Sequence, residues 1–128
     1  MPSIDGLNRW VVRVFAPILV LTGAAGFFVP ADLALMSGAP AYNVFHVVAG
    51  GVGLLAAFAG GSRAASAFNL GFGIVDLYQA VAGAAGWFPA ALFAYRPADD
   101  VLHVVLGLGL CAVGAMGFKP PARSGEPG

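Results

Sequence analysis

Four long apolar segments constrain the fold of this chain more than any other feature. They cover approximately residues 10–29, 42–60, 64–88 and 101–118. Each is close to the roughly 20 residues with which a helix crosses about 30 Å of hydrocarbon. Backbone groups in lipid must be satisfied within the spanning segment, which favours helices. The sequence therefore predicts an all-α membrane protein with four transmembrane helices.

The composition agrees with a lipid environment. Of the 128 residues, 59% are hydrophobic and 9% are charged, whereas about 25% are charged in a typical soluble domain. We therefore expect the lipid bilayer to cover much of the surface. The formal net charge is zero, so nothing in it points to a nucleic-acid partner. The single cysteine, Cys111, excludes an internal disulfide and is interpreted as a small packing residue.

An internal echo carries both histidines of the chain. The stretch Asn43–Gly50 (NVFHVVAG) reappears as Asp100–Gly107 (DVLHVVLG), with His46 and His103 at the same point. In each copy a glycine follows four residues after the histidine, on the same helix face. The echo predicts an internal duplication of a two-helix unit.

The echo extends upstream and suggests an arrangement in space. Residues 23–28 (GAAGFF) match residues 83–88 (GAAGWF), sixty positions later. A repeated hairpin predicts an up-down-up-down bundle over residues 1–118, in which both copies enter the membrane in the same direction. The second and fourth helices of such a bundle lie diagonally across its core. We therefore expect both histidines at one depth.

The distribution of charge predicts an orientation. The positive-inside rule places the basic residues and both termini in the cytoplasm of a bacterium, with the protein in the inner membrane. The loops over residues 30–41 and 89–100 then face outward. Residues 119–128 are rich in proline and glycine and are predicted to be a disordered cytoplasmic tail. The basic residues on the inner side are Arg9, Arg13, Arg63, Lys119 and Arg123, and the charges on the outer side are Arg96, Asp32, Asp99 and Asp100.

Two charged residues lie within the apolar segments and form a candidate pair. With the sixty-residue offset, Asp76 corresponds to Ala16, and Arg13 lies about one turn nearer the cytoplasm on the matching helix. We expect an Arg13–Asp76 ion pair that fixes the helix register. Two alternatives stay open: a snorkelling Arg13 beside a water-exposed Asp76, and Asp76 as a proton-carrying carboxylate in a transport path.

Three interpretations of the histidine pair are open. Each imidazole could form a structural hydrogen bond, for instance with Asn43 or Asp100 three residues earlier. The pair could instead bind a transition metal or serve as the axial ligands of haem b. A pH-sensing or proton-relay role is the third. Asn43, Asp99 and Asp100 are also expected to cap the helices that they begin. The aromatic residues expected at the membrane interfaces are Trp10, Tyr42, Trp87 and Tyr95.

The two histidine segments resemble a bacterial membrane family. They read Asn43-x-x-His46-x-x-x-Gly50 and Ala98-Asp99-Asp100-Val101-Leu102-His103-x-x-x-Gly107. They are similar to the family named domain of unknown function 4383, over roughly residues 8–118. The family's members look like small four-helix membrane proteins, so the resemblance implies that fold and location and no reaction. This chain has Asp100 where the family pattern leads us to expect Asn.

The function expected from the sequence is non-enzymatic. Motifs for serine hydrolases, dinucleotide binding, phosphate loops and zinc proteases do not occur. We therefore expect an accessory or assembly subunit, whose partners are other membrane helices or a second copy, and no cofactor. One alternative is a haem- or metal-binding redox module that uses His46 and His103. The other is a small proton-coupled carrier that uses Asp76.

Overall fold

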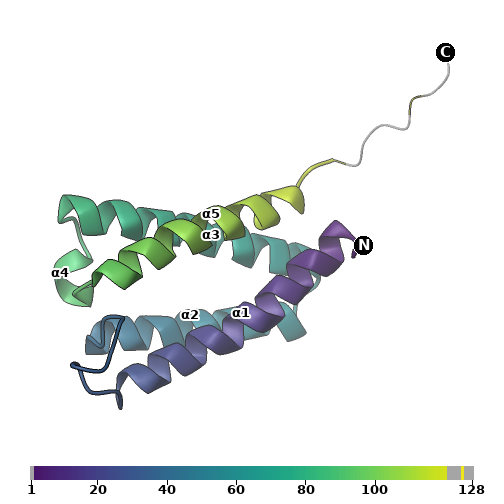
Figure 1. The fold of residues 1–128 in the computed structure, drawn as a ribbon. Helices are drawn as coiled ribbons and strands as arrows, with labels where there is room; N and C mark the ends of the chain where they lie inside the picture. Colours follow the sequence, from purple (N-terminus) through teal and green to yellow (C-terminus); the bar gives the residue numbers. More distant parts are fainter. Residues whose placement is uncertain (1, 121–124, 126–128) are drawn as a thin grey trace.

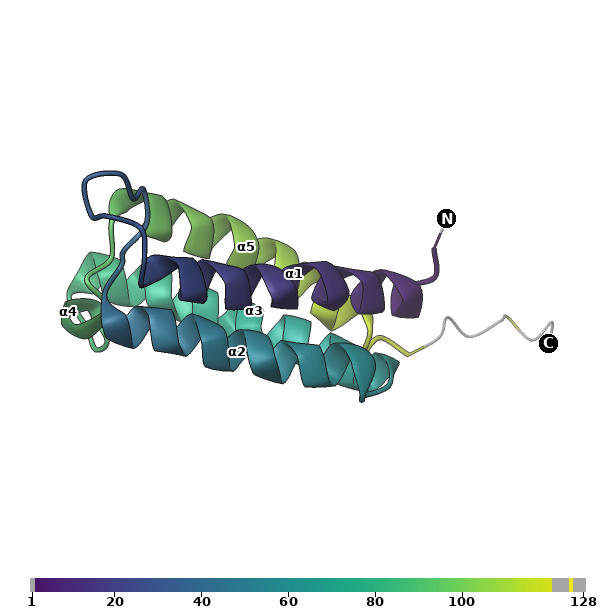
Figure 2. The same ribbon diagram turned by 90° about the horizontal axis from the view of Figure 1, so that it is seen from below.

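The computed structural model describes residues 2–120 and 125, and this part of the chain is all-helical. Four long helices lie side by side, and successive ones run in opposite directions (Figures 1 and 2). Of the tail predicted for residues 119–128, positions 121–124 and 126–128 lie outside the described residues. The helices are α1 (Ile4–Gly26), α2 (Pro40–Phe58), α3 (Ser62–Ala85), the short α4 (Ala90–Phe93) and α5 (Pro97–Met116).

All four long helices begin and end earlier than the apolar segments suggest, because local signals fix their ends. The Ser3 hydroxyl accepts a hydrogen bond from the Gly6 amide (3.0 Å) and caps α1. Pro40 and Pro97 open α2 and α5, where a missing N–H is harmless and φ is already helical. α3 ends at Gly86, whose φ of 71° is left-handed and suits glycine. The one-turn α4 was not predicted.

The long helices associate in pairs. α1 packs along α2 and α3 packs along α5, while α1 and α3 also touch each other. α2 and α5 make no close backbone contact, so these two histidine-bearing helices lie on opposite sides of the α1–α3 contact. Figure 1 shows the two pairs one above the other, joined by the turn between α2 and α3.

Glycines allow both pairs to approach closely. A Cβ at Gly50 would lie 2.6 Å from Val20 Cγ2 and 2.9 Å from the Ala16 carbonyl oxygen on α1. A Cβ at Gly107 would lie 2.8 Å from Leu77 Cγ on α3. Such small-residue contacts let helices associate in lipid, where no hydrophobic force drives them together.

The surface is far more apolar than that of a soluble protein, and the interior holds many polar side chains. Large apolar side chains cover the outside of every long helix, as at Val48, which is 60% exposed. In soluble proteins an exposed apolar surface this extensive marks a binding or membrane face. Among the described residues, ten polar or charged side chains are buried: Asn8, Ser37, Asn43, His46, Ser66, Asn69, Asp76, Gln79, Asp99 and His103.

Three of the four predicted spans, α1, α2 and α5, are long and apolar enough to cross a membrane. α3 has 24 residues and is also long enough, but it carries four buried polar side chains that lower its mean hydropathy. These side chains, Ser66, Asn69, Asp76 and Gln79, all face the interior. The chain is therefore an all-helical protein with three clear membrane-length helices and a fourth whose polar face is covered by its neighbours.

Candidate functional site: a polar cavity between the helices

Tyr42 joins the two histidines into one cluster. Its hydroxyl and His103 Nε2 are 2.8 Å apart and form a buried hydrogen bond between α2 and α5. Its ring centroid lies 4.1 Å from that of His46 and 6.1 Å from that of His103. The expectation of an interfacial Tyr42 was therefore wrong, since the side chain is 0% exposed. The sequence contained a signal for this burial, because Tyr42 lies four residues before His46 and therefore on the same helix face.

Both histidines are buried, His46 at 5% exposure and His103 at 4%. The hydrogen bonds expected from their own helices are not formed. The side-chain amide of Asn43 instead donates to the carbonyl oxygen of Gly38 (3.0 Å), and Asp100 packs against Gly83 of α3. His103 Nδ1 is buried and has no partner among the described residues.

Asp76 enters the same region from α3 and is 3% exposed. Its Oδ1 accepts a hydrogen bond from the Gln79 amide (3.2 Å), whose own oxygen accepts one from the Tyr95 hydroxyl (2.9 Å). Tyr95 lies in the segment before α5. Burial, helped by the nearby Asp99 carboxylate, raises the pKa of its hydroxyl, so it stays a neutral donor. A hydrogen-bonded chain thus leads from the loop before α5 to Asp76.

The expected contact between Arg13 and Asp76 is not formed. Arg13 is exposed, and its Nε donates to the carbonyl oxygen of Ala57 at the end of α2 (3.3 Å). Its guanidinium carbon lies 5.4 Å from the ring centroid of Phe58. Arg13 therefore links α1 to the end of α2, away from the histidine cluster.

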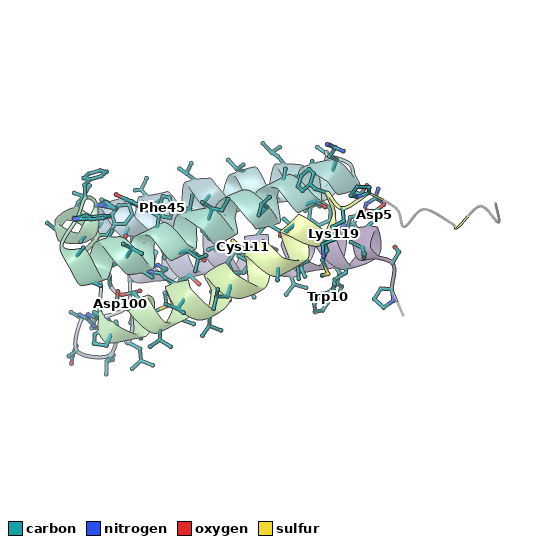
Figure 3. The ribbon with its side chains drawn as sticks, turned by 90° about the horizontal axis from the view of Figure 1, so that it is seen from above. Asp5, Trp10, Phe45, Asp100, Cys111 and Lys119 are labelled. Atoms are coloured by element: carbon teal, nitrogen blue, oxygen red, sulfur yellow. The ribbon has the colours of Figure 1, made fainter. Side chains whose placement is uncertain are left out.

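Of the three expected caps, Asp99 alone caps a helix start. Its Oδ2 accepts hydrogen bonds from the backbone amides of Arg96 and Ser37, both at 2.8 Å. Asp99 thus caps α5 and also ties down the loop before α2. Asn43 and Asp100 lie inside the first turns of α2 and α5, because these helices begin at prolines. Figure 3 shows Asp100 at the opposite end of the molecule from Asp5 and Lys119.

Two adjoining cavities meet at His46. The inner cavity, of about 180 Å³, lies between the helices and has Tyr42, His46, Asp76 and His103 in its wall. The outer cavity, of about 640 Å³, is open and lies under the loop before α2. Three residues belong to the walls of both: Thr22, Met36 and His46. The histidine pair and Asp76 therefore line one cavity that adjoins a larger, more open one.

No protein-family model, no curated protein and no solved structure matches this chain. The resemblance to domain of unknown function 4383 therefore stays a prediction.

The described residues include no group of three or more His, Cys, Asp and Glu side chains that could hold a metal ion. Both imidazoles lie beside the Tyr42 ring. The cluster consists of two imidazoles, one carboxyl group and one phenol around a small cavity. Such groups can exchange protons and can bind a small polar molecule.

Proposed function

We propose that this chain is a multi-pass membrane protein in which α1, α2, α3 and α5 all span the bilayer as an up-down-up-down bundle. The apolar surface and the buried polar side chains support this proposal, since lipid favours an apolar surface and polar residues face the interior of a bundle. The outward face of α3 is apolar, with Ile74 and Val81 more than half exposed. Its polar residues are covered by α1 and α5, so α3 is as suited to lipid as the other three helices.

A tandem hairpin agrees with the contacts that recur along the chain. Gly26 abuts the Asn43 side chain and Gly83 abuts that of Asp100, while Gly50 packs on α1 and Gly107 on α3. The residue numbers in each matching pair, 26 and 83, 43 and 100, and 50 and 107, differ by 57. His46 and His103 differ by the same number, which supports an equal depth for both.

We propose that the end of the bundle with the cavities faces outward from a bacterial inner membrane. The basic residues Arg9, Arg63 and Lys119 belong to the opposite end, where α1 begins and α5 ends. By the positive-inside rule that end is cytoplasmic. The outer cavity then opens to the exterior.

Within the bundle we propose a non-enzymatic carrier that couples a small solute to protons at Asp76. The observation that carries this proposal is the inner cavity, whose wall contains Asp76 and both histidines and adjoins an open cavity. An ionised carboxylate is costly to bury alone, and either a proton or a bound cation removes that cost. The alternative of an accessory subunit needs no such interior site, and a metal module would need a third ligand beside the two imidazoles, which the described residues do not supply.

Thiol labelling of intact cells tests the orientation and the open cavity together. In a Cys111→Ser background, single cysteines are introduced as Asp32→Cys, Thr22→Cys and Val48→Cys. A small, charged, membrane-impermeant thiol reagent should modify Asp32→Cys in the outer loop and Thr22→Cys in the shared cavity wall. It should not modify Val48→Cys, which faces lipid.

Each contrary result has its own meaning. Reaction at Asp32→Cys without reaction at Thr22→Cys would reject the open cavity, and the accessory-subunit alternative would then be preferred. Reaction at Asp32→Cys only in inverted vesicles would reverse the orientation. Reaction at Val48→Cys equal to that at Asp32→Cys would contradict a lipid-facing surface.

A further inference from the structure

The inner cavity combines aromatic walls with a single carboxyl group. Phe15, Tyr42 and Phe72 contribute rings, and Asp76 contributes the acid. The hydrogen-bond partner of Asp76 is the uncharged amide of Gln79. A carboxylate among aromatic faces is complementary to a cation, because the ring faces are also attractive to positive charge.

Arg96, the cationic side chain nearest this end of the bundle, already has hydrogen-bond partners away from the cavity. Arg96 Nη1 donates to the carbonyl oxygens of Ala31 (3.0 Å) and Ala34, so the guanidinium stabilises the loop before α2. Asp99 adds a second buried carboxylate beside the cluster and uses one oxygen to bind two backbone amides. Its other oxygen is buried without a partner. The interior at this end thus has an excess of acceptors.

His103 supplies an unpaired polar atom at the same cavity. Its Nε2 is bound to the Tyr42 hydroxyl, whereas Nδ1 has no partner among the described residues. In the tautomer with its proton on Nε2, His103 donates this hydrogen bond to the Tyr42 oxygen. Nδ1 is then an acceptor that can take an N–H group from a ligand.

We propose that the inner cavity binds a small primary ammonium cation, namely ammonium itself or a short alkylammonium. This inference rests on the proposed carrier function and names the class of its solute. The charged nitrogen binds Asp76 and donates to His103 Nδ1, while the alkyl part packs against the Phe15 and Phe72 rings. The cavity, at about 180 Å³, is smaller than the roughly 300 Å³ at the low end for drug-sized ligands.

Equilibrium dialysis of the purified full-length protein in lipid nanodiscs tests this directly, with radiolabelled methylammonium as the probe. We expect saturable binding that unlabelled ammonium displaces and acetate does not. Asp76→Asn should weaken binding about tenfold or more, as the loss of a hydrogen bond to a charged group does. Asp76→Glu keeps the charge and should still bind. The matched control is Asp5→Asn, the same change at an exposed residue of the opposite end, which should bind as the unaltered protein does.

A second measurement does not depend on how well the Asp76 variants fold. Methylammonium should slow the labelling of Thr22→Cys, whereas the same concentration of sodium acetate should not. Absence of both saturable binding and protection, in protein whose Thr22→Cys is readily labelled, would overturn the ammonium site and leave the open cavity standing. Thr22→Cys that is never labelled would instead reject the proposed function itself. Undiminished binding by Asp76→Asn, or preferential binding of acetate, would also overturn the site.

Discussion

Tyr42 connects residues that lie far apart in the sequence, because its ring lies beside that of His46 and its hydroxyl forms a hydrogen bond with His103. Tyr42→Phe keeps the ring and removes the hydroxyl, so the His103 imidazole loses its recorded partner. A buried polar group left unpaired costs about 1–3 kcal/mol. We therefore expect a lower melting temperature of the detergent-solubilised protein, measured by circular dichroism.

Tyr78→Phe is the matched control for this variant. Its hydroxyl also forms a hydrogen bond, to the carbonyl oxygen of Phe88 (2.7 Å), but at an exposed site. Its removal should change stability by less than about 0.5 kcal/mol. Equal effects of the two substitutions would mean that the Tyr42–His103 bond does not hold the cluster together.

At the residue scale, three side chains singled out from the sequence lie around one cavity, but the partners predicted for them were wrong. His46, His103 and Asp76 were singled out because polar groups within apolar segments are rare, and all three line one cavity. The expected Arg13–Asp76 pair used an offset of sixty residues between the two repeats, whereas the contacts that recur in the two helix pairs are 57 residues apart. With 57, Arg13 corresponds to Leu70, and at 1.5 Å per residue Asp76 lies about 9 Å further along the helix. The rotation and register that decide such partners depend on packing, which a uniformly apolar segment does not encode.

At the scale of helices, two glycines in equivalent positions set the distance within each pair. Gly50→Ala and Gly107→Ala should each destabilise the protein by about 1–3 kcal/mol, because the added methyl group overpacks a tight contact. Gly51→Ala and Gly109→Ala are the controls, since a Cβ there meets nothing within 4 Å. The controls should be neutral or stabilising by up to about 1 kcal/mol, through higher helix propensity. Thermal unfolding in detergent measures all four variants, and destabilising controls would mean that the glycines serve something other than close approach.

Asp99 stabilises the start of α5 and also the loop before α2. Asp99→Ala removes the acceptor of the Arg96 and Ser37 amides and should cost about 2 kcal/mol. Hydrogen exchange at the Ser37 amide should accelerate, which a loss of helix capping alone would not cause. Asp32→Ala, an exposed change in the same loop, should leave that exchange rate unaltered. Unchanged exchange in Asp99→Ala would show that the loop is held by other contacts.

Helix existence could be predicted from the sequence because the length of an apolar run is enough to indicate a membrane helix. The helix ends were less accurate, since Ser3, Pro40 and Pro97 extend each helix beyond its apolar run. The short α4 was missed because four residues leave no periodic signal. α3 has the least apolar sequence of the long helices, and only the arrangement of its neighbours accounts for its buried polar face.

For the molecule as a whole, the polar interior and the apolar exterior have one explanation if lipid surrounds the bundle. Water outside would leave many apolar side chains exposed, whereas lipid would cover those on the outer faces of the helices. The same distribution explains why the interior can hold several polar groups at a single level. Small residues at the helix contacts provide close packing, and the larger polar side chains fill the space where the pairs diverge around the cavities.

A lipid-facing surface makes a prediction opposite to that for a soluble protein. Val48 lies at the middle of α2 on the outward face, so Val48→Lys should cost about 2.5–3.5 kcal/mol of insertion free energy. Leu55→Lys is the matched control, because it is also exposed but lies near the end of α2, where a lysine can snorkel to the interface. We expect the membrane-integrated fraction in a glycosylation-mapping or fractionation assay to fall for Val48→Lys and to change little for Leu55→Lys. If the outer face met water, Val48→Lys would instead raise solubility and leave the fold intact, and that outcome would contradict the bilayer location on which the carrier proposal depends.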